Sequence, residues 1–548
     1  MDLTRYRSYE EITRGFRWEI PLRYNIAAAV DAHARGQERV ALYYEDPAGK
    51  AAAYTFDDLK RLSNRLANAL TALGVRKGDR VALVLPQRPE TGVTHLALYK
   101  VGAVAVPISF LYGPRALEHI LGDCEATALV IGAEFLDKLA PVRDRLPALR
   151  HVLVVGGETA GHLDFQAILA RGGEVFAPAD TAAEDSALLL YTSGTTGSPK
   201  GALHAQRILP GYLLTFSLFF NLRFDERTVF WTPSDWAWVG GLLDILLPAW
   251  ALGHPVLGYA GRFDPDRAFG LMAKYRVTHT FLAPTALKML AQVPHPKESY
   301  GLALQVIASG GESVASEILR WGREELGVPV NEFYGLTEVN HLIGSCAALW
   351  GIVPGSMGLP YPGREVALVD GDGRPVSPGE EGEIVVRRGD PTCFLGYWGK
   401  PEKTREMMRG EWVLTGDLAE RDERGHYFFK GRKDDLIISA GYRVGPAEVE
   451  EALLQLPEVA EAAVVGSPDP TRGEVVKAFV KLAAGVEGSA ELARRIQQHV
   501  RDNLAAYKYP REIEFADGLP TTTTGKLNRR LLRQQERERK GGLGQQTS

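Results

Sequence analysis

The sequence has few cysteines and no long uninterrupted apolar run, and each shortage excludes a class of protein. Its three cysteines, Cys124, Cys346 and Cys393, are far apart and show no metal-ligand spacing, which favours free thiols in a reducing compartment. The most apolar stretch, GGLLDILLPAWALG, contains Asp244 and Pro248 and is too short to span a bilayer. The N-terminal residues show no apolar signal-peptide core. We therefore expect a cytoplasmic protein without integral membrane association.

A basic excess is also missing, because 63 Lys and Arg face 68 Asp and Glu and give a formal net charge of -5. A nucleic-acid backbone calls for a basic face, so this balance argues against nucleic acid as a partner. With 548 residues, the chain is too long for one core, and two or more domains are expected. The oligomeric state is left open, with a homodimer as one option.

Short apolar runs alternate with helical patterns over the first two thirds of the chain. RVALVLP (80–86) predicts a buried strand, and FDDLKRLSNRLANALTALG predicts a helix that ends at Gly74. This alternation predicts an α/β fold of mostly parallel sheets covered by helices. Later, short strands joined by Asp, Gly and Pro turns indicate a β-rich subdomain, and the final unit reads as a small α+β domain. We predict an N-terminal domain over residues 1–433 and a C-terminal domain over residues 434–548.

YTSGTTGSPKG (191–201) follows the predicted strand SALLL and suits a polyphosphate. Its glycines let the backbone approach a ligand, and loop N–H groups can point at an anion. It is not a Walker-type loop, because Pro199 stands at the second glycine and Gly201 replaces the Ser or Thr that holds Mg²⁺. A Gly/Ser/Thr-rich surface turn is the simpler alternative. The predicted phosphate-binding residues are Thr192, Ser193, Gly194, Thr195, Thr196, Gly197 and Lys200.

The same segment resembles the phosphate-loop signature of the adenylate-forming superfamily, which includes acyl-CoA synthetases, luciferases and peptide-synthetase adenylation domains. Further pieces follow in the family's order: SGGESV (309–314), NEFYGLTE (331–338), the stretch 410–450, and PTTTTGKLNRR (520–530). The resemblance implies a large N-terminal α/β domain and a small, mobile C-terminal α+β domain. It also implies a reaction in two steps: a carboxylate and MgATP give acyl-AMP and pyrophosphate, and the thiol of CoA then gives acyl-CoA and AMP.

The resemblance assigns nucleotide contacts in both domains. Thr337 resembles the hydroxyl at the α-phosphate, Glu338 the carboxylate that binds Mg²⁺, and Asp417 the carboxylate that binds the ribose. Alone, a Thr-Glu pair is typical of a helix start and a Gly-Asp pair of a turn. The other implied ATP and AMP contacts are Gly310, Gly311, Glu312, Glu332, Phe333, Tyr334, Gly335, Phe429, Arg432 and Arg443.

Lys526 completes the implied catalytic set with Thr337 and Glu338. It resembles the lysine that reaches the α-phosphate and the acyl carboxylate, where an ammonium offsets the negative charge that builds on phosphorus. Without the motif it is a lysine near a basic helix. Asp434 resembles the hinge about which the C-terminal domain swings. Gly441 resembles the small residue beside the tunnel for the pantetheine arm of CoA.

Trp238, Val239 and Gly240 resemble the acyl-pocket wall of short- and medium-chain acyl-CoA synthetases. Asp235 is the candidate partner for the ammonium group of an amino-acid substrate, but we interpret it as part of the wall. Acetyl-CoA synthetases carry a tryptophan at the position of Gly335, where it caps a two-carbon pocket. Gly335 therefore predicts a short- to medium-chain acid, with branched and aromatic acids included, rather than acetate.

Two other function classes stay open. An acyl-AMP-forming enzyme with a non-CoA acceptor shares the first half-reaction but shows no CoA dependence. A non-catalytic ATP-binding homologue is the other alternative, and retention of Lys200, Glu338, Asp417 and Lys526 argues against it. The expected function is that of an ATP-dependent carboxylic acid–CoA ligase that uses ATP, Mg²⁺ and coenzyme A.

Overall fold

The computed structural model describes residues 3–192, 199–440, 442–504, 507–522 and 526–544. The chain divides into two compact units. Unit 1 comprises Met1–Glu365 and Val386–Val413, and unit 2 comprises Val366–Val385 and Leu414–Ser548. The chain therefore leaves unit 1, returns to it once, and ends in unit 2. The predicted domain boundary at residues 433–434 stays a prediction.

Unit 1 contains a nine-stranded sheet whose middle is parallel. In the order β16-β15-β14-β13-β12-β10-β11-β1-β2, every pair from β14 to β1 is parallel, and the outer pairs are antiparallel. Its strands are β1 (Val40–Glu45), β2 (Ala51–Thr55), β10 (Phe230–Trp231), β11 (Val256–Tyr259), β12 (His279–Phe281), β13 (Val306–Gly310), β14 (Val330–Leu336), β15 (Asn340–Gly344) and β16 (Leu359–Pro360).

The second sheet of unit 1 has eight strands in the order β19-β9-β8-β4-β3-β5-β6-β7. Strands β8 to β7 in this order pair in parallel, whereas β9 is antiparallel to both β8 and β19. Its strands are β3 (Arg80–Val84), β4 (Val104–Pro107), β5 (Ala128–Gly132), β6 (His151–Val155), β7 (Leu163–Asp164), β8 (Ser186–Thr192), β9 (Lys200–Ala205) and β19 (Gly396–Tyr397).

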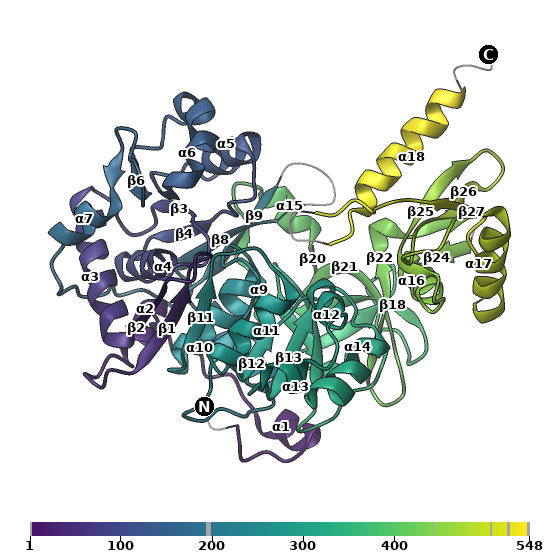
Figure 1. Cartoon of the computed structure of the whole chain (residues 1–548), viewed down its shortest axis with the longest axis horizontal. Coiled ribbons are helices and arrows are strands. Elements are labelled where there is room, and N and C mark those ends of the chain that lie inside the picture. Colours follow the sequence, from purple (N-terminus) through teal and green to yellow (C-terminus); the bar gives the residue numbers. More distant parts are fainter. Residues whose placement is uncertain (1–2, 193–198, 441, 505–506, 523–525, 545–548) are drawn as a thin grey trace. The chain divides into compact units, whose positions relative to one another are not determined.

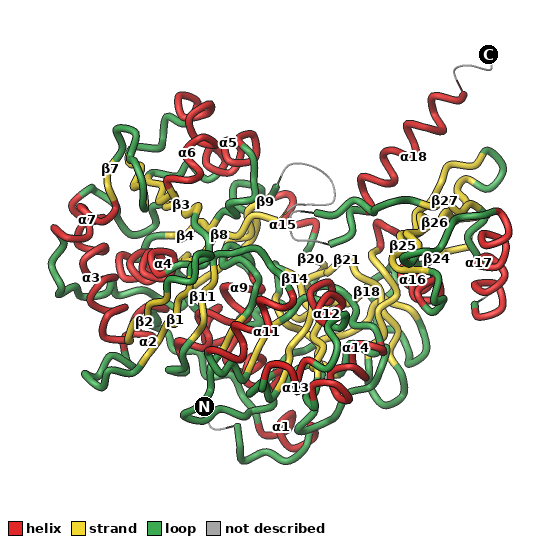
Figure 2. The backbone as a smooth tube through the Cα atoms, viewed as in Figure 1, coloured by secondary structure: helices red, strands yellow, loops and turns green. Residues whose placement is uncertain are grey.

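Helices flank the strands of unit 1 in Figures 1 and 2. The mixed α/β class predicted from the alternating pattern is confirmed, and so are the buried strand β3 and the helix after Thr55. The helices are α1 (Tyr9–Gly15), α2 (Ile26–Asp31), α3 (Phe56–Ala72), α4 (Pro89–Val101), α5 (Pro114–Asp123), α6 (Leu136–Leu139), α7 (Phe165–Arg171), α8 (Ile208–Phe219), α9 (Val239–Gly241), α10 (Leu247–Ala251), α11 (Pro265–Lys274), α12 (Pro284–Leu290), α13 (Pro296–Tyr300), α14 (Ser316–Trp321) and α15 (Pro401–Glu406).

Helix α3 shows how local sequence fixes an element. Thr55 and Asp58 form a capping box, in which each side chain accepts from the other residue's backbone N–H. This pairs two of the amides that a helix start leaves without intrahelical partners. At the other end Gly74 has φ +87°, a left-handed conformation that glycine adopts without a Cβ penalty. The helix therefore starts and stops where the sequence predicts.

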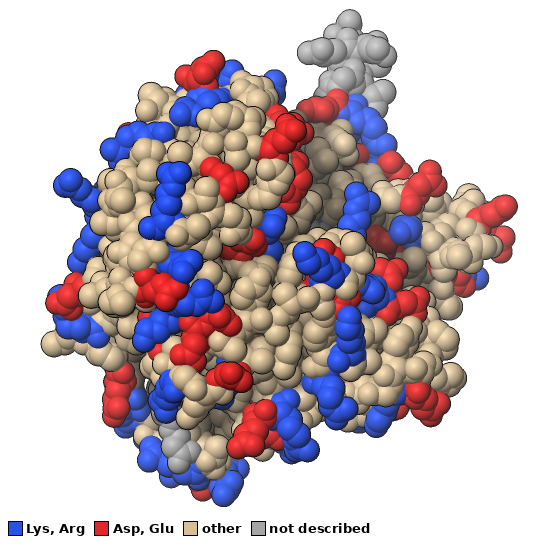
Figure 3. All heavy atoms as spheres, turned by 60° about the vertical axis from the view of Figure 1, so that its left-hand side comes forward, with Lys and Arg blue, Asp and Glu red and all other residues tan. Residues whose placement is uncertain are grey.

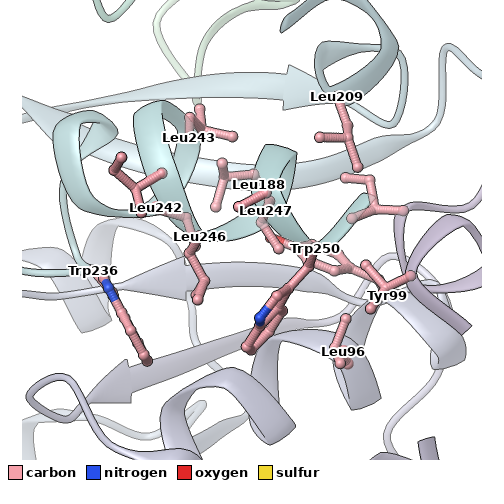
Figure 4. Close-up of a cluster of buried hydrophobic side chains, with 14 of the residues drawn as sticks. Leu96, Tyr99, Leu188, Leu209, Trp236, Leu242, Leu243, Leu246, Leu247 and Trp250 are labelled. Atoms are coloured by element: carbon pink, nitrogen blue, oxygen red, sulfur yellow. The ribbon is translucent and has the colours of Figure 1, made fainter. Parts of the chain in front are cut away.

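The apolar stretch around residue 245 is buried inside unit 1 (Figure 4). Leu242–Leu246 form one π-helical turn that continues into α10. Trp250 packs beside Leu96 and Tyr99 of α4, and its indole N–H donates to the carbonyl of Ala41 at 2.8 Å. A Cβ at Gly92 of α4 would lie 2.4 Å from the Trp250 ring, so the helix and the indole are in close contact. None of the described helices is long and apolar enough to cross a membrane.

Unit 2 has two small sheets. The first joins β17, β18 and β21, with β22 beside β21; the second has the order β24-β23-β26-β25, with β27 beside β26. The strands are β17 (Val366–Val369), β18 (Glu381–Arg387), β21 (Trp412–Arg421), β22 (Tyr427–Arg432), β23 (Ile437–Ser439), β24 (Tyr442–Val444), β25 (Val459–Asp469), β26 (Gly473–Leu482) and β27 (Glu512–Phe515). The short β20 (Met408–Arg409) falls in unit 1, where it pairs with residues 412–413 at the start of β21.

Three helices cover the second sheet of unit 2: α16 (Pro446–Leu454), α17 (Ala490–Asn503) and α18 (Arg529–Gly544). Alternate residues of β25 face opposite sides, as strand geometry requires. Val464 packs with the apolar residues of α16 and α17, whereas Val465 packs with Leu532 of α18. The ammonium of Lys477 in β26 pairs with the carboxylate of Glu536 in α18 at 2.9 Å. Unit 2 thus has a core of its own.

Surface charges of both signs are interspersed on the face drawn in Figure 3. The picture agrees with the near balance of 63 basic and 68 acidic residues in the sequence.

Trp250→Ala should destabilise unit 1 by about 3–5 kcal/mol, because it empties a buried ring site and leaves the Ala41 carbonyl without its donor. Urea unfolding followed by circular dichroism measures the effect. The control is Leu22→Ala, since Leu22 is 88% exposed. Equal midpoints for the two variants would contradict the expectation.

Candidate active site

The predicted phosphate loop connects two antiparallel strands. Strand β8 ends at Thr192 and β9 begins at Lys200, and these two residues are register partners. The structure therefore confirms the strand before the loop and places both flanking residues side by side. Ser193, Gly194, Thr195, Thr196 and Gly197 lie outside the described residues, so their contacts with phosphate stay a prediction.

Both ends of this hairpin are fixed to helix α5 and its neighbours. The hydroxyl of Tyr191 donates to Asp123 at 2.7 Å, and the ammonium of Lys400 pairs with the same carboxylate at 2.7 Å. On the other side, a ring nitrogen of His119 lies 3.0 Å from the carbonyl of Pro199. Burial is the main cause that raises the pKa of Tyr191, so its phenol stays protonated and keeps donating.

Thr337 and Glu338 lie in the tight turn between β14 and β15. Gly335 comes so close to β15 that a Cβ there would lie 2.0 Å from the carbonyl oxygen of Asn340. Asn340 has φ +58°, a region that asparagine tolerates better than most residues. Its amide accepts from Tyr212 at 2.5 Å and donates to the carbonyl of Thr392 at 2.8 Å. The backbone of the turn is therefore closely specified.

The segment that returns to unit 1 joins this turn to strand β9. The N–H of Phe394 donates to the carbonyl of Glu338 at 2.8 Å. Four residues later the N–H of Trp398 donates to the carbonyl of Gly201 at 2.8 Å. Between them, Tyr397 donates its hydroxyl to Oε1 of Glu338 at 2.6 Å, and the ammonium of Lys200 lies 4.8 Å from the centre of its ring. Tyr397 was not among the predicted site residues.

Two further predicted nucleotide segments lie at the carboxyl ends of neighbouring parallel strands. Gly310 ends β13 and is the register partner of Phe333 in β14, while Gly311 follows with φ +89°. A Cβ at Gly310 would lie 2.6 Å from the Phe333 ring, so this glycine allows the two strands to pack. Ligands of open α/β sheets bind outside the carboxyl ends of strands. Glu312 and Thr337 follow the ends of β13 and β14, and Tyr334 lies within the last three residues of β14.

The predicted acyl wall begins in the turn before α9. The carboxyl of Asp235 accepts from the Ser109 hydroxyl at 3.0 Å and from the Ala237 N–H at 3.1 Å, and burial raises its pKa to about 6. Trp238 contacts Tyr112 edge to face at 5.8 Å. The interpretation of Asp235 as wall rather than as the partner of a substrate ammonium stays a prediction.

The predicted wall is joined to strand β14 by aromatic packing. A Cβ at Gly240 would lie 2.7 Å from the Phe281 ring, so Gly240 and Phe281 are in direct contact. Phe281 stacks on Phe333 with ring centroids 5.6 Å apart. Val239 packs against the buried core of unit 1. Changes at the wall would therefore reach β14, which carries Glu332 and Tyr334.

A buried His–Asp pair links the π-helical turn after the predicted wall to β15. Asp244 lies in the π-helical turn, and its carboxylate is 2.9 Å from Nε2 of His341. Nδ1 of the same ring lies 3.1 Å from the hydroxyl of Thr215. The sequence signal was weak, because VNHLIG reads as a plain strand and Asp244 as an interruption of an apolar run.

In unit 2, the predicted ribose contacts meet across two strands. Asp417 of β21 and Arg432 of β22 are register partners, and the guanidinium Nε lies 3.8 Å from the carboxylate. Asp417 is buried and its N–H donates to the Thr415 hydroxyl at 3.1 Å. Phe429 lies on the same strand as Arg432, opposite Ala419.

The predicted hinge lies in a 3₁₀ turn, Lys433–Asp435, directly after β22. Arg533 of α18 donates to the carbonyl of Asp434 at 2.8 Å and pairs with the carboxylate of Asp435 at 2.6 Å. The ammonium of Lys433 pairs with Glu383 at 3.0 Å. The turn is therefore anchored by side chains of unit 2 on both sides of Asp434.

The predicted catalytic lysine is exposed in unit 2. The N–H of Lys526 donates to the Thr522 hydroxyl at 3.2 Å, and its carbonyl accepts from the Thr522 N–H at 2.6 Å. This backbone pairing holds a short loop before α18. Arg443 lies in β24, opposite Ile438. Gly441 lies outside the described residues, so its place beside CoA stays a prediction.

Comparison with known families decides the identity. The model described as AMP-binding enzyme matches residues 29–398, and that of the AMP-binding enzyme C-terminal domain matches residues 448–526. The chain belongs to the AMP-binding enzymes. This confirms the adenylate-forming family predicted from the motifs.

Relatives place this AMP-binding enzyme among the acyl-CoA synthetases. The acetyl-coenzyme A synthetase of Bacillus subtilis (strain 168) is 36% identical over 557 residues, covering 96% of this chain and 95% of the relative. The mitochondrial acyl-coenzyme A synthetase ACSM4 of Rattus norvegicus is 36% identical over 535 residues, covering 94% and 91%. The crystal structure of the anthranilate CoA ligase AuaEII with anthranoyl-AMP aligns with a TM-score of 0.87 at 32% identity, covering 95% and 99%. Use of ATP and CoA fits this family.

In this AMP-binding enzyme, Gly335→Ala should distort the turn that carries Thr337 and Glu338, because the added Cβ meets backbone that has no flexible end to move. We expect loss of most ATP-dependent activity with a lower thermal midpoint. Gly270→Ala is the control, since a Cβ at Gly270 of α11 meets nothing within 4 Å and alanine favours helix by about 1 kcal/mol. A fully active Gly335→Ala enzyme would show that the turn tolerates the change.

Asp235 should make stability depend on pH. Its raised pKa, about 6, means that the folded chain holds the proton more tightly than the unfolded chain, for which 3.8 is the reference. The associated stability is present below pH ~4 and is lost as the pH rises through 6. Asp235→Asn should therefore gain up to about 3 kcal/mol relative to the wild type between pH 4 and pH 7.

Urea unfolding at several pH values measures this gain, with Asp137→Asn as the exposed control in unit 1. Wild-type and Asp235→Asn curves that stay parallel across the range would contradict the raised pKa.

Proposed function

We propose that the chain is an ATP-dependent ligase that joins a short- to medium-chain carboxylic acid to CoA, with branched and aromatic acids included. The observation that carries the proposal is the meeting of Lys200, Tyr397 and Glu338 in unit 1. A cation for phosphate and a carboxylate for a metal lie around one ring, at the end of the predicted phosphate loop. An adenylating site needs both charges at one place.

The proposed first step is attack of the substrate carboxylate on the α-phosphate of ATP. Lys200 would neutralise the β- and γ-phosphates, and Thr337 would donate to the α-phosphate. Lys526 would place its ammonium where negative charge builds on phosphorus. Asp417 suits the vicinal hydroxyls of the ribose as a bidentate acceptor, and Arg432 suits a phosphate or a second ribose contact.

Glu338 fits the role of magnesium ligand. Its carboxylate is nearly buried and oriented by the Tyr397 hydroxyl, and oxygen ligands of this kind suit a hard cation. One protein carboxylate is enough where ATP phosphates and water supply the other ligands. When bound, the ion would offset charge on the phosphates, and the residues around it would hold the nucleotide in line with the acid.

The choice of acid rests on the resemblance of the wall and on two relatives. The relative ACSM4 is named an acyl-CoA synthetase, and AuaEII is named an anthranilate CoA ligase. A Cβ at Gly335 would clash with the backbone of Asn340 whatever the size of the pocket, so a substitution there does not test pocket size. Substrates test it better, since a hydrophobic pocket separates neighbouring homologues by only about 1–3 kcal/mol.

Pyrophosphate release over C2 to C12, branched and aromatic acids, each with and without CoA, tests the proposal. Thioester formation that needs CoA and peaks beyond acetate supports it. Pyrophosphate without any thioester would favour an acyl-AMP enzyme with another acceptor. Activity confined to acetate would refute the prediction that Gly335 leaves room for a longer acid. An absence of pyrophosphate with every acid would favour a non-catalytic ATP-binding homologue. Light scattering measures the oligomeric state, for which a homodimer is one option.

Lys526→Ala should reduce adenylation at least ~100-fold, because the offsetting charge is lost in the first step. CoA attack on supplied acyl-AMP should continue near the wild-type rate. The two half-reactions are measured separately, by pyrophosphate release and by thioester formation from acyl-AMP. Lys540→Ala is the control, a lysine of α18 that pairs with Glu512. Equal loss of both half-reactions would contradict a role of Lys526 in the adenylation step alone.

A further inference from the structure

Tyr397 lies between two predicted active-site residues that come from distant parts of unit 1. It belongs to the two-residue strand β19 and is the register partner of Ala202 in β9. Its hydroxyl donates to Oε1 of Glu338 at 2.6 Å, and the Lys200 ammonium lies 4.8 Å from the ring centre. The side chain therefore touches one residue of the phosphate-loop strand and one of the β14–β15 turn.

The two contacts use different parts of the phenol. A hydrogen bond from O–H to a carboxylate is charge-assisted and short, typically 2.5–2.7 Å, and the observed length falls in that range. The ring face attracts a cation through its quadrupole. Removing the hydroxyl alone would therefore change Glu338 and leave the ring for Lys200.

The ring is held independently of its hydroxyl. Phe394 packs edge to face against it at 5.1 Å, and Met407 and Met408 pack on the same small cluster. The backbone is fixed by the N–H of Leu395, which donates to Leu203 at 2.7 Å, and by the pairing of β19 with β9. A phenylalanine would occupy the same place.

We propose that Tyr397 is a positioning residue that fixes the carboxylate of Glu338 for the metal of MgATP and keeps it in register with Lys200. The inference rests on the proposed roles of these two residues. Tyr397 acts through Glu338, not on the reacting atoms. Outer-shell partners of this kind orient a metal ligand and tune its affinity.

Tyr397→Phe is the test, and Tyr275→Phe is the matched control. Tyr275 also donates its hydroxyl at 2.6 Å to a buried carboxylate of unit 1, that of Glu45, among residues with no proposed role in the site. Binding of Mn²⁺ to the enzyme with α,β-methylene ATP, which is not cleaved at the reacting bond, is followed by electron paramagnetic resonance. The readout needs no turnover.

The expected result is that Tyr397→Phe weakens Mn²⁺ binding about tenfold, the scale for a lost outer-shell partner, while Tyr275→Phe stays within about twofold of the wild type. Pyrophosphate release by Tyr397→Phe should recover as Mg²⁺ is raised. In the Glu338→Gln background, Tyr397→Phe should add little further loss, because the two residues act together.

Unchanged Mn²⁺ affinity in Tyr397→Phe, or additive losses in the double variant, would overturn the proposal. So would a Tyr397→Phe chain that fails to fold while Tyr275→Phe folds, since the hydroxyl would then be a folding contact. Failure of the proposed function is distinguishable, because the wild type itself would then form no CoA-dependent thioester with any acid.

Discussion

The structure of unit 1 depends on how the backbone of residues 394–398 is paired. Buried amides need partners. The N–H of Phe394 donates to the carbonyl of Glu338, and those of Leu395 and Trp398 donate to carbonyls of β9, while the N–H of Tyr397 donates to the Thr404 hydroxyl. The chain reaches this place only after it has passed through unit 2. A carboxylate and a lysine that are far apart in sequence are thereby held at one ring, that of Tyr397, whose hydroxyl continues the same connection.

Much of this arrangement could be predicted from local sequence. The capping box at Thr55, the terminal Gly74 and the apolar strands report short-range physics, which acts wherever the chain goes. The strand before the phosphate loop has the same origin. The motifs also name residues that the structure brings together, such as Asp417 and Arg432, since their strands are neighbours in sequence and joined by a short turn.

What the sequence could not predict depends on contacts between distant segments. A strand of two residues has no periodicity, so β19 and its Tyr397 leave no signal in the sequence. In the sequence, Asp244 only interrupts an apolar run. The structure places its carboxylate 2.9 Å from Nε2 of His341, a contact that the sequence does not indicate. The division of the chain has the same difficulty, because Val366–Val385 fold with the C-terminal part while Val386–Val413 fold with the N-terminal part. The predicted boundary at residues 433–434 remains a separate prediction.

These long-range contacts also constrain how substrate choice can vary. Gly240 of the predicted acyl wall touches Phe281, which stacks on Phe333 of β14. Asp244, in the π-helical turn that follows the predicted wall, reaches His341 of β15. The same two strands carry the turn with Thr337 and Glu338. Interiors packed at crystal-like density transmit volume changes rather than absorb them. A larger side chain at the predicted wall would therefore press on the strands that carry the turn proposed to hold metal and phosphate.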